Sequence, residues 1–193
     1  MHKHLINYLI LMIALAMCGC STTVHELAHN SPGPSPDEAV VVIGIDSPLY
    51  RVLVYPGVLA GKTFHMHYTR SAVFSGTAQN GYLVVKIPAG EMMAITTVVA
   101  RDSPEGPGKP FLACDRSQTL VFQPPPGQVI YIADVSYQRN GEKLITSYTR
   151  HLEDARSYLR NHYPAIASGL KQHEARLLPT TQKCTLTIML PIM

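Results

Sequence analysis

Five consecutive residues near the start of the chain, His25-Glu26-Leu27-Ala28-His29, match the pattern H-E-x-x-H. In that pattern two histidines one helical turn apart hold a zinc ion, and the glutamate acts as the general base in peptide hydrolysis. The chemistry needs a helix packed under a sheet and a third metal ligand. Here the proline-rich run at 30–34 ends any helix at once. A zinc metallopeptidase through His25, Glu26 and His29 is therefore the least favoured of three functional hypotheses.

A second pair of histidines, His65 and His67, lies in a run with the composition of a strand. Alternate residues of a strand share a face, so the two imidazoles could bridge a metal ion. No cysteine or carboxylate stands at a spacing that would complete such a site. We therefore predict no cofactor, and we keep a ligand- or metal-binding module with His65 and His67 in its site as the second hypothesis.

The run Gly57 to Thr63, GVLAGKT, has the look of a phosphate-binding loop but not its geometry. That loop needs four residues between its glycines and then a helix whose amides point at the phosphate. This run has three residues between Gly57 and Gly61, and a strand-like sequence follows. The chain also has no nucleophile-elbow, C-x-x-C or dinucleotide motif. We predict that the protein is not an enzyme.

The elements that position these residues begin after an export signal. Residues 2–4 are polar and basic, and 5–17 form a nearly continuous apolar run that is too short to cross a bilayer as a helix. The run leads into Cys18-Gly19-Cys20. This ending resembles the lipobox of bacterial lipoproteins, in which a small residue precedes the acylated cysteine. The resemblance implies a signal peptide over 1–19 and lipidation of Cys20, with Cys18 as the alternative.

The predicted lipid anchor decides the compartment and the first functional hypothesis. Acyl chains on one cysteine hold a protein stably on a membrane. Ser21 follows Cys20, and similarity to Gram-negative lipoproteins implies an outer-membrane location facing the periplasm. The net charge of +3 gives no argument for a nucleic-acid partner. We expect a non-enzymatic lipoprotein of the cell envelope that binds a partner protein.

Composition and the positions of proline- and glycine-rich turns predict how the rest of the chain is organised. Residues 20–38 are rich in proline and small polar residues, which is typical of a flexible tether. The domain is predicted over 39–193. The 15 prolines and 13 glycines of the whole chain, together with its clustered β-branched residues, favour a mainly β fold. Strand-like runs are predicted at 39–45, 49–55, 91–101, 111–114 and 119–123.

Two Asn-Gly dipeptides predict β-hairpins, because this dipeptide fits the tight turn between antiparallel strands. Asn80-Gly81 separates the runs 72–78 and 82–88, and Asn140-Gly141 separates 129–138 and 143–149.

The pattern then becomes helical. Residues 152–160 place apolar side chains on one helical face, and a second helix is predicted from Ala165 to about Leu177. The alternating run Cys184 to Leu190 predicts a final strand that returns to the sheet.

The runs NGYLVVKIPAGEMMAITTV at 80–98 and TLVFQPPPGQVIYIADV at 119–135 carry a family resemblance. They resemble uncharacterised bacterial lipoprotein domains in which a Pro-Ala-Gly turn leads into one strand and a tyrosine-containing strand follows. The resemblance covers about residues 80–165 and implies a small β-sandwich, similar to prealbumin-like or carboxypeptidase-regulatory-like modules, without enzymatic activity. We expect a mainly β chain: one prealbumin- or Ig-like β-sandwich of about seven to nine strands, a C-terminal helical segment and a final strand.

Cysteine usage predicts one disulfide. If Cys18 is removed and Cys20 is acylated, Cys114 and Cys184 remain as an even pair in an oxidising compartment. Cys184 shares the parity of three apolar residues in its predicted strand, so its side chain should face the core. The two cysteines are 70 residues apart, and a bond between them would stabilise the fold by about 4 kcal/mol in the chain-entropy model.

Overall fold

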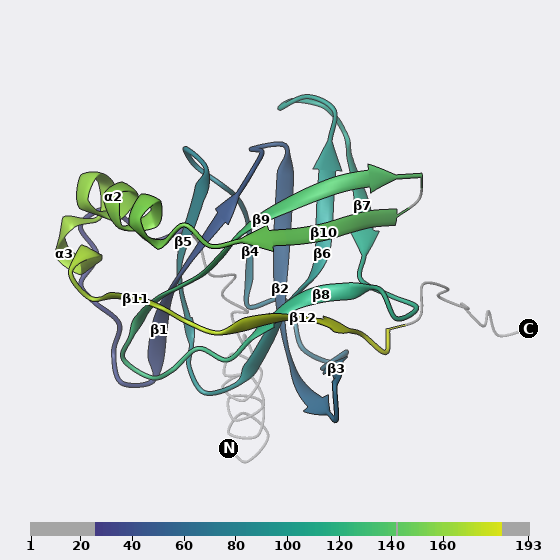
Figure 1. The fold of residues 1–193 in the computed structure, drawn as a ribbon, viewed down its shortest axis with the longest axis horizontal. Coiled ribbons are helices and arrows are strands. Elements are labelled where there is room, and N and C mark those ends of the chain that lie inside the picture. Colours follow the sequence, from purple (N-terminus) through teal and green to yellow (C-terminus); the bar gives the residue numbers. More distant parts are fainter. Residues whose placement is uncertain (1–25, 142, 183–193) are drawn as a thin grey trace, which may run out of the picture.

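A computed structural model describes residues 26–141 and 143–182 and shows two β-sheets packed face to face, with a short helical segment at one end (Figure 1). The mainly β sandwich with a C-terminal helical segment, predicted from the sequence, is confirmed, although the described residues form twelve strands rather than about seven to nine. The elements are β1 Glu38–Ile45, β2 Tyr50–Ala60, β3 Thr63–Met66, β4 Phe74–Thr77, β5 Tyr82–Pro88, β6 Met92–Arg101, β7 Gly108–Leu112, β8 Gln118–Phe122, β9 Val129–Asn140, β10 Lys143–Thr149, α2 Leu152–His162, α3 Pro164–Ala167, β11 Leu170–Gln172 and β12 Ala175–Pro179.

The first sheet has the strand order β10-β9-β1-β5. Its central strand β1 pairs antiparallel with β5 on one side and parallel with β9 on the other. The far edge of β9 is shared by two strands, because β11 pairs with its beginning and β10 with its end. The chain therefore leaves this edge through α2 and α3 and returns to it at β11.

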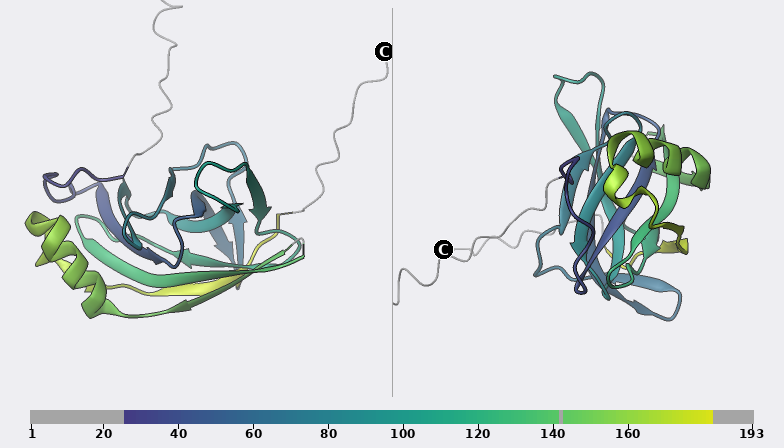
Figure 2. Two further views of the ribbon diagram at one scale, coloured as in Figure 1. Left: turned by 90° about the horizontal axis from the view of Figure 1, so that it is seen from above. Right: turned by 90° about the vertical axis from the view of Figure 1, so that its left-hand side faces the viewer.

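The second sheet has the order β12-β8-β6-β2-β3, with β4 added to β2 and β7 added to β6. This sheet curls, and Figure 2 shows the curl from above. At the curled end Phe64 of β3 forms a parallel bridge with Thr180, directly after β12. The bridge brings the two outer strands of the sheet, β3 and β12, together. The curled end of the sheet holds a small core of Phe64, Ala94 and Val121.

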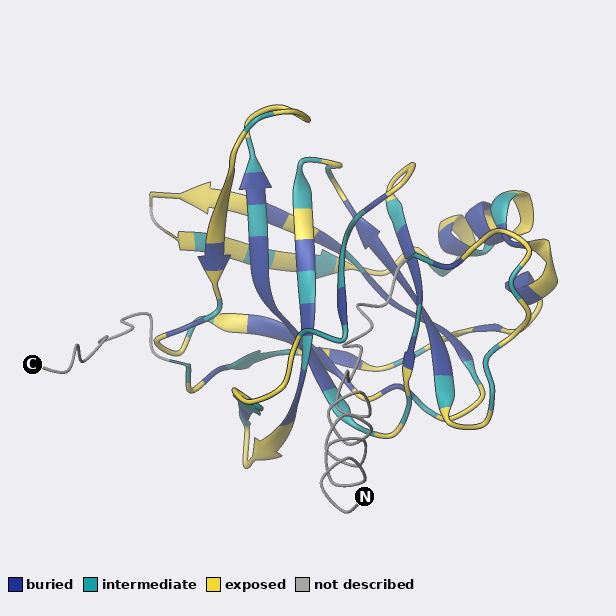
Figure 3. Ribbon diagram, turned by 180° about the vertical axis from the view of Figure 1, so that it is seen from behind, coloured by how far each residue is buried: buried dark blue, intermediate teal, exposed yellow. Residues whose placement is uncertain are grey.

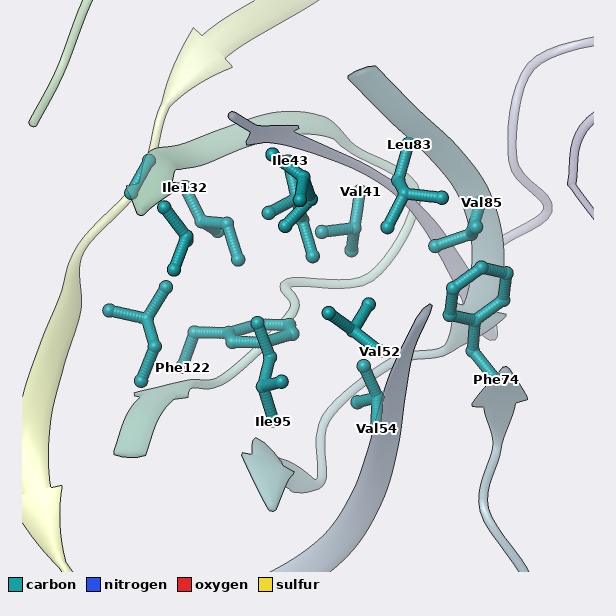
Figure 4. Packing of buried hydrophobic residues seen from close by; sticks show 14 of the residues in the cluster. Val41, Ile43, Val52, Val54, Phe74, Leu83, Val85, Ile95, Phe122 and Ile132 are labelled. Carbon is teal, nitrogen blue, oxygen red and sulfur yellow. The ribbon is translucent and has the colours of Figure 1, made fainter. Parts of the chain in front are cut away.

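The main core fills the space between the two sheets. Figure 4 shows side chains of β1, such as Val41 and Ile43, facing side chains of β2, such as Val52 and Val54. The outer face of β1 is buried as well, because Val40 and Val42 pack under α2. A strand covered on both faces reads as a continuous apolar run rather than an alternating one, and Ala39-Val40-Val41-Val42-Ile43 is such a run.

The two Asn-Gly predictions have different outcomes. The β9–β10 hairpin is confirmed, with Asn140 opposite Lys143. Asn80 and Gly81 also form a tight turn, with φ angles of 50° and 89°, which only residues tolerant of positive φ adopt readily. The strands that flank this turn, however, do not pair with each other: β4 joins β2 and β5 joins β1. The turn therefore carries the chain from one sheet to the other.

The helical prediction holds for α2 and fails for the segment after it. In α2 the buried residues are Ala155, Tyr158 and Leu159 on the predicted face. The second helix predicted from Ala165 to Leu177 is wrong, because α3 ends at Ala167 and β11 and β12 follow. β11 pairs with the open edge of β9, and β12 pairs with the open edge of β8. A local sequence pattern does not reveal this pairing, because it depends on backbone hydrogen bonds to distant strands.

The predicted tether also needs a correction. Glu26 forms a bridge with Val85 of β5, and the Leu27 N–H donates to the Val84 carbonyl oxygen at 2.8 Å. The Leu27 side chain is buried in the cluster under α2. The folded domain therefore begins before the predicted boundary at 39, because Leu27 covers the otherwise open edge of β5. Residues 20–25 and the predicted final strand 184–190 lie outside the described residues.

Candidate functional site

The first candidate, the H-E-x-x-H segment, lies in extended backbone and a turn rather than in a helix. The Tyr163 hydroxyl donates to Glu26 Oε1 at 3.3 Å, and His29 Nδ1 donates to the His162 carbonyl oxygen at 2.9 Å. The His29 ring also stacks on Tyr163, with centroids 5.0 Å apart. His25 lies outside the described residues. Glu26 and His29 thus attach the N-terminal segment to α2, and the helix that the zinc chemistry requires is not formed at 26–29.

The second candidate pair has no further ligand in the described part of the chain. His65 lies on β3, and the His67 N–H directly after it donates to the Pro56 carbonyl oxygen at 3.0 Å. Among residues 26–141 and 143–182, no three or more His, Cys, Asp or Glu side chains are grouped so that they could hold a metal ion. His65 and His67 therefore remain an isolated pair in this part of the structure.

Cys114 is buried beside the start of β8, with Sγ 3.3 Å from the Leu112 carbonyl oxygen. Its predicted partner, Cys184, lies outside the described residues. The Asp115 N–H donates to the Gln182 carbonyl oxygen at 2.7 Å, so the chain that leads to Cys184 runs directly past Cys114. Because only two peptide units separate Gln182 from Cys184, a bond to Cys114 is within the reach of the backbone, and the disulfide stays a prediction.

A polar cluster that sequence spacing did not reveal lies where β9, β10 and α2 meet. His151 Nδ1 is 2.7 Å from Asp134 Oδ2, and the His151 N–H donates to the Tyr131 hydroxyl at 3.0 Å. The second carboxylate oxygen, Asp134 Oδ1, is buried against Gly44 of β1. The sequence holds one indirect signal for this contact. Only two residues link β10 to α2, so His151 must stay close to β9, the strand that pairs with β10. This cluster fixes the start of α2 on the sheet.

Aromatic rings continue this cluster along α2. Tyr82 of β5 packs on Tyr158 with centroids 4.7 Å apart, and Tyr158 packs on His162 at 4.5 Å. Burial, and then the charge of Asp134, raise the pKa of Tyr82 to about 12. Burial likewise raises the pKa of the Tyr163 hydroxyl. Both phenols are therefore neutral at physiological pH and serve for packing and hydrogen bonding rather than as nucleophiles.

A groove of about 690 Å³ opens between β7 of one sheet and β10 of the other. Its lining includes Ile95 and Val98 of the main core, Leu144 that packs against this core, and the buried Phe111, while polar and charged residues line the rest of it. β7 and β10 each pair with only one neighbour, and Figure 1 shows them at the same end of the sandwich. We call this feature the β7–β10 groove.

A second exposed apolar feature is the hairpin formed by the ends of β2 and β3. The run Gly57 to Thr63 forms the turn and part of both strands of this hairpin. A strand follows the run where a phosphate-binding loop would need a helix, so the run is not such a loop. Val58 is 51% exposed and Leu59 is 41% exposed, and Tyr68 at the base of the hairpin is 63% exposed. We call these three residues the hairpin patch.

The contact between Gly44 and Asp134 generates a test of the polar cluster. A β carbon at Gly44 would collide with Asp134 Oδ1, so Gly44→Ala should push this side chain away from His151 and cost about 1–3 kcal/mol of unfolding free energy. Asp134→Ala should relieve most of the collision, giving a coupling of about 0.5–3 kcal/mol in a double-mutant cycle measured by urea unfolding. Gly33→Ala, with no atom within 4 Å of the added carbon, is the control. Additive effects would contradict the contact.

The burial of Glu26 generates a pH prediction. Burial raises the pKa of this carboxyl above 4.5, although the Tyr163 hydroxyl opposes the rise. The folded state then holds the proton more tightly than the unfolded state, so the contribution of Glu26 to stability improves as the pH falls towards 4.5. Glu26→Gln should be at least as stable as the native chain at pH 7, and the difference should shrink on acidification. Tyr163→Phe should steepen the native pH dependence. A constant difference between pH 7 and pH 4 would contradict the burial of the charge.

Comparison with known proteins assigns no family to the chain. No protein-family model, curated protein or solved structure matches it. Within the described residues, no helix has the length and apolar character needed to cross a membrane. The features of the described residues that bear on function are therefore the β7–β10 groove, the hairpin patch and the polar cluster.

Proposed function

We propose that the protein is a non-enzymatic lipoprotein of the bacterial envelope that binds a partner protein through the hairpin patch. The anchor in this proposal is the acylated Cys20 predicted from the sequence, and the binding surface is the exposed end of β2 together with Tyr68 after β3. The observation that carries it is the concentration of exposed large apolar side chains, Val58, Leu59 and Tyr68, on one hairpin. The two other such residues in the described part, Leu112 and Ile145, lie at the β7–β10 groove.

The geometry of the hairpin favours a protein partner over a lipid surface. The end of β2 and the turn that leads into β3 extend from the body of the sandwich, and Figure 3 shows the exposed end of β2 in yellow. Val58 and Leu59 are neighbours in one strand, so their side chains point to opposite faces. A lipid surface is matched by one apolar face, whereas a hairpin that is apolar on both faces fits a cleft between elements of another protein.

The residue types in the patch also suit a protein interface. Tyrosine is enriched among residues that dominate binding energy, because it combines a large apolar area with a hydroxyl. Tyr68 is the most exposed large apolar residue in the described part of the chain. A lipid anchor would hold the patch at the membrane surface, where envelope proteins are concentrated and a modest intrinsic affinity is sufficient.

A site-specific photo-crosslinker at Leu59 tests this proposal in the acylated full-length chain in its native membranes. We expect an adduct with one protein of defined mass, and none from the same crosslinker at Lys171, an exposed polar position on β11. The purified partner should then bind the Val58→Ser/Leu59→Ser variant at least about tenfold more weakly. Folding stability should change by less than about 0.5 kcal/mol, because both residues are exposed.

Two outcomes would contradict the proposal. One is equal binding of the partner by the native chain and the double variant. The other is direct binding of the unacylated Cys20→Ser chain to vesicles of phosphatidylethanolamine and phosphatidylglycerol, lost in the double variant. The second result would make the hairpin patch a membrane contact.

A further inference from the structure

We propose that residues 184–190 of this same chain occupy the β7–β10 groove as an added strand along the outer edge of β10. The inference is independent of the partner proposed for the hairpin patch, which lies on other strands. It rests on four features of the described residues and of the sequence: the open edge of β10, the apolar side chains that line the groove, the position of Gln182 and the pattern of the segment that follows.

The groove runs along an unpaired strand edge. β10 pairs with β9 on one side, and no strand of the described chain pairs with its other side. The groove touches Leu144, Ile145 and Thr146 in succession. Consecutive residues of a strand point to opposite faces, so a cavity that touches all three lies along the edge of the strand. Such an edge offers free N–H and C=O groups to another strand.

The apolar side chains that line the groove favour an apolar occupant. Ile95 and Val98 of β6 and Phe111 of β7 line the groove opposite Leu144. These side chains belong to or adjoin the main core, and Leu112 and Ile145 at the rim are exposed. A volume of about 690 Å³ accommodates several large side chains at once. A strand with alternating apolar residues would place every second side chain against these residues.

The C-terminal segment starts at the rim of the groove. The Gln182 carbonyl oxygen accepts a hydrogen bond from Asp115 at 2.7 Å, and Thr180 Oγ1 donates to the Ala113 carbonyl oxygen at 2.6 Å. Both Ala113 and Asp115 line the groove. Seven residues in strand conformation span about 23 Å, which is more than the stretch of β10 that borders the groove.

The sequence of the segment fits the groove. In Cys184-Thr185-Leu186-Thr187-Ile188-Met189-Leu190, the cysteine, Leu186, Ile188 and Leu190 share one face. Cys114 also lines the groove. The predicted bond from Cys114 to Cys184 would hold the beginning of the segment at one end of the groove and so set its register along β10. The apolar face of the segment would then meet Ile95, Val98 and Phe111.

Hydrogen exchange tests the inference on the mature chain and on a chain that ends at Gln182. We expect amides of residues 143–146 to exchange at least tenfold faster in the shortened chain. A synthetic peptide of residues 183–193 with Cys184→Ser, added in excess, should restore the slow exchange. Amides of β1, which is central in its sheet, should be unchanged in all three samples and serve as the internal control.

A second pair of variants keeps the test decisive if the shortened chain does not fold. In the full chain, Leu186→Asp/Ile188→Asp should speed exchange at 143–146, whereas Thr185→Asp/Thr187→Asp on the opposite face should not. Equal exchange in the native chain and the Leu186/Ile188 variant would overturn the inference. Protection that grows with protein concentration would also overturn it, because the occupant would then be a second copy of the chain.

Discussion

The structure depends on the burial of β1 on both of its faces. One face meets the second sheet across the main core, and the other lies under α2. A strand in this position must satisfy its backbone groups sideways, which β5 and β9 do on its two edges. The helix must also stay in place over the outer face. The pair of Asp134 and His151 and the ring contacts of Tyr158 hold it there. The polar cluster is therefore a consequence of the two-sided burial rather than a separate catalytic arrangement.

Open strand edges are the second constraint, and the chain covers them in different ways. Glu26 and Leu27 cover part of β5, and the bridge between Phe64 and Thr180 joins the two ends of the curled sheet. β11 extends the cover on β9 where β10 ends. The edge of β10 beside the β7–β10 groove has no partner strand among the described residues, which is the reason for proposing the C-terminal segment as its occupant. The hairpin patch is different, since its exposed residues lie at the end of a hairpin and continue no core.

Local signals in the sequence predicted local structure well. The β9–β10 hairpin followed from Asn140-Gly141, and α2 followed from helical spacing at 152–160. Pairing between distant segments was less accessible: the turn at Asn80-Gly81 is formed, yet its flanking strands join different sheets. The helix expected after Ala165 is replaced by β11 and β12, because open edges elsewhere in the fold recruit this segment. The contact between His151 and Asp134 follows from no sequence motif for the same reason, since only the fold brings these residues together.

The central claim is that the chain is an acylated envelope module whose last segment is tied back to the domain by Cys114 and Cys184. The most direct test is the intact mass of the protein extracted from its native membranes, measured before and after reduction. The account predicts a chain that begins at Cys20, carries acyl groups and gains two hydrogen atoms on reduction. An unacylated mass, or a chain that retains residues 1–19, would contradict the anchor. An acylated chain whose mass is unchanged by reduction would contradict the tie between the two cysteines.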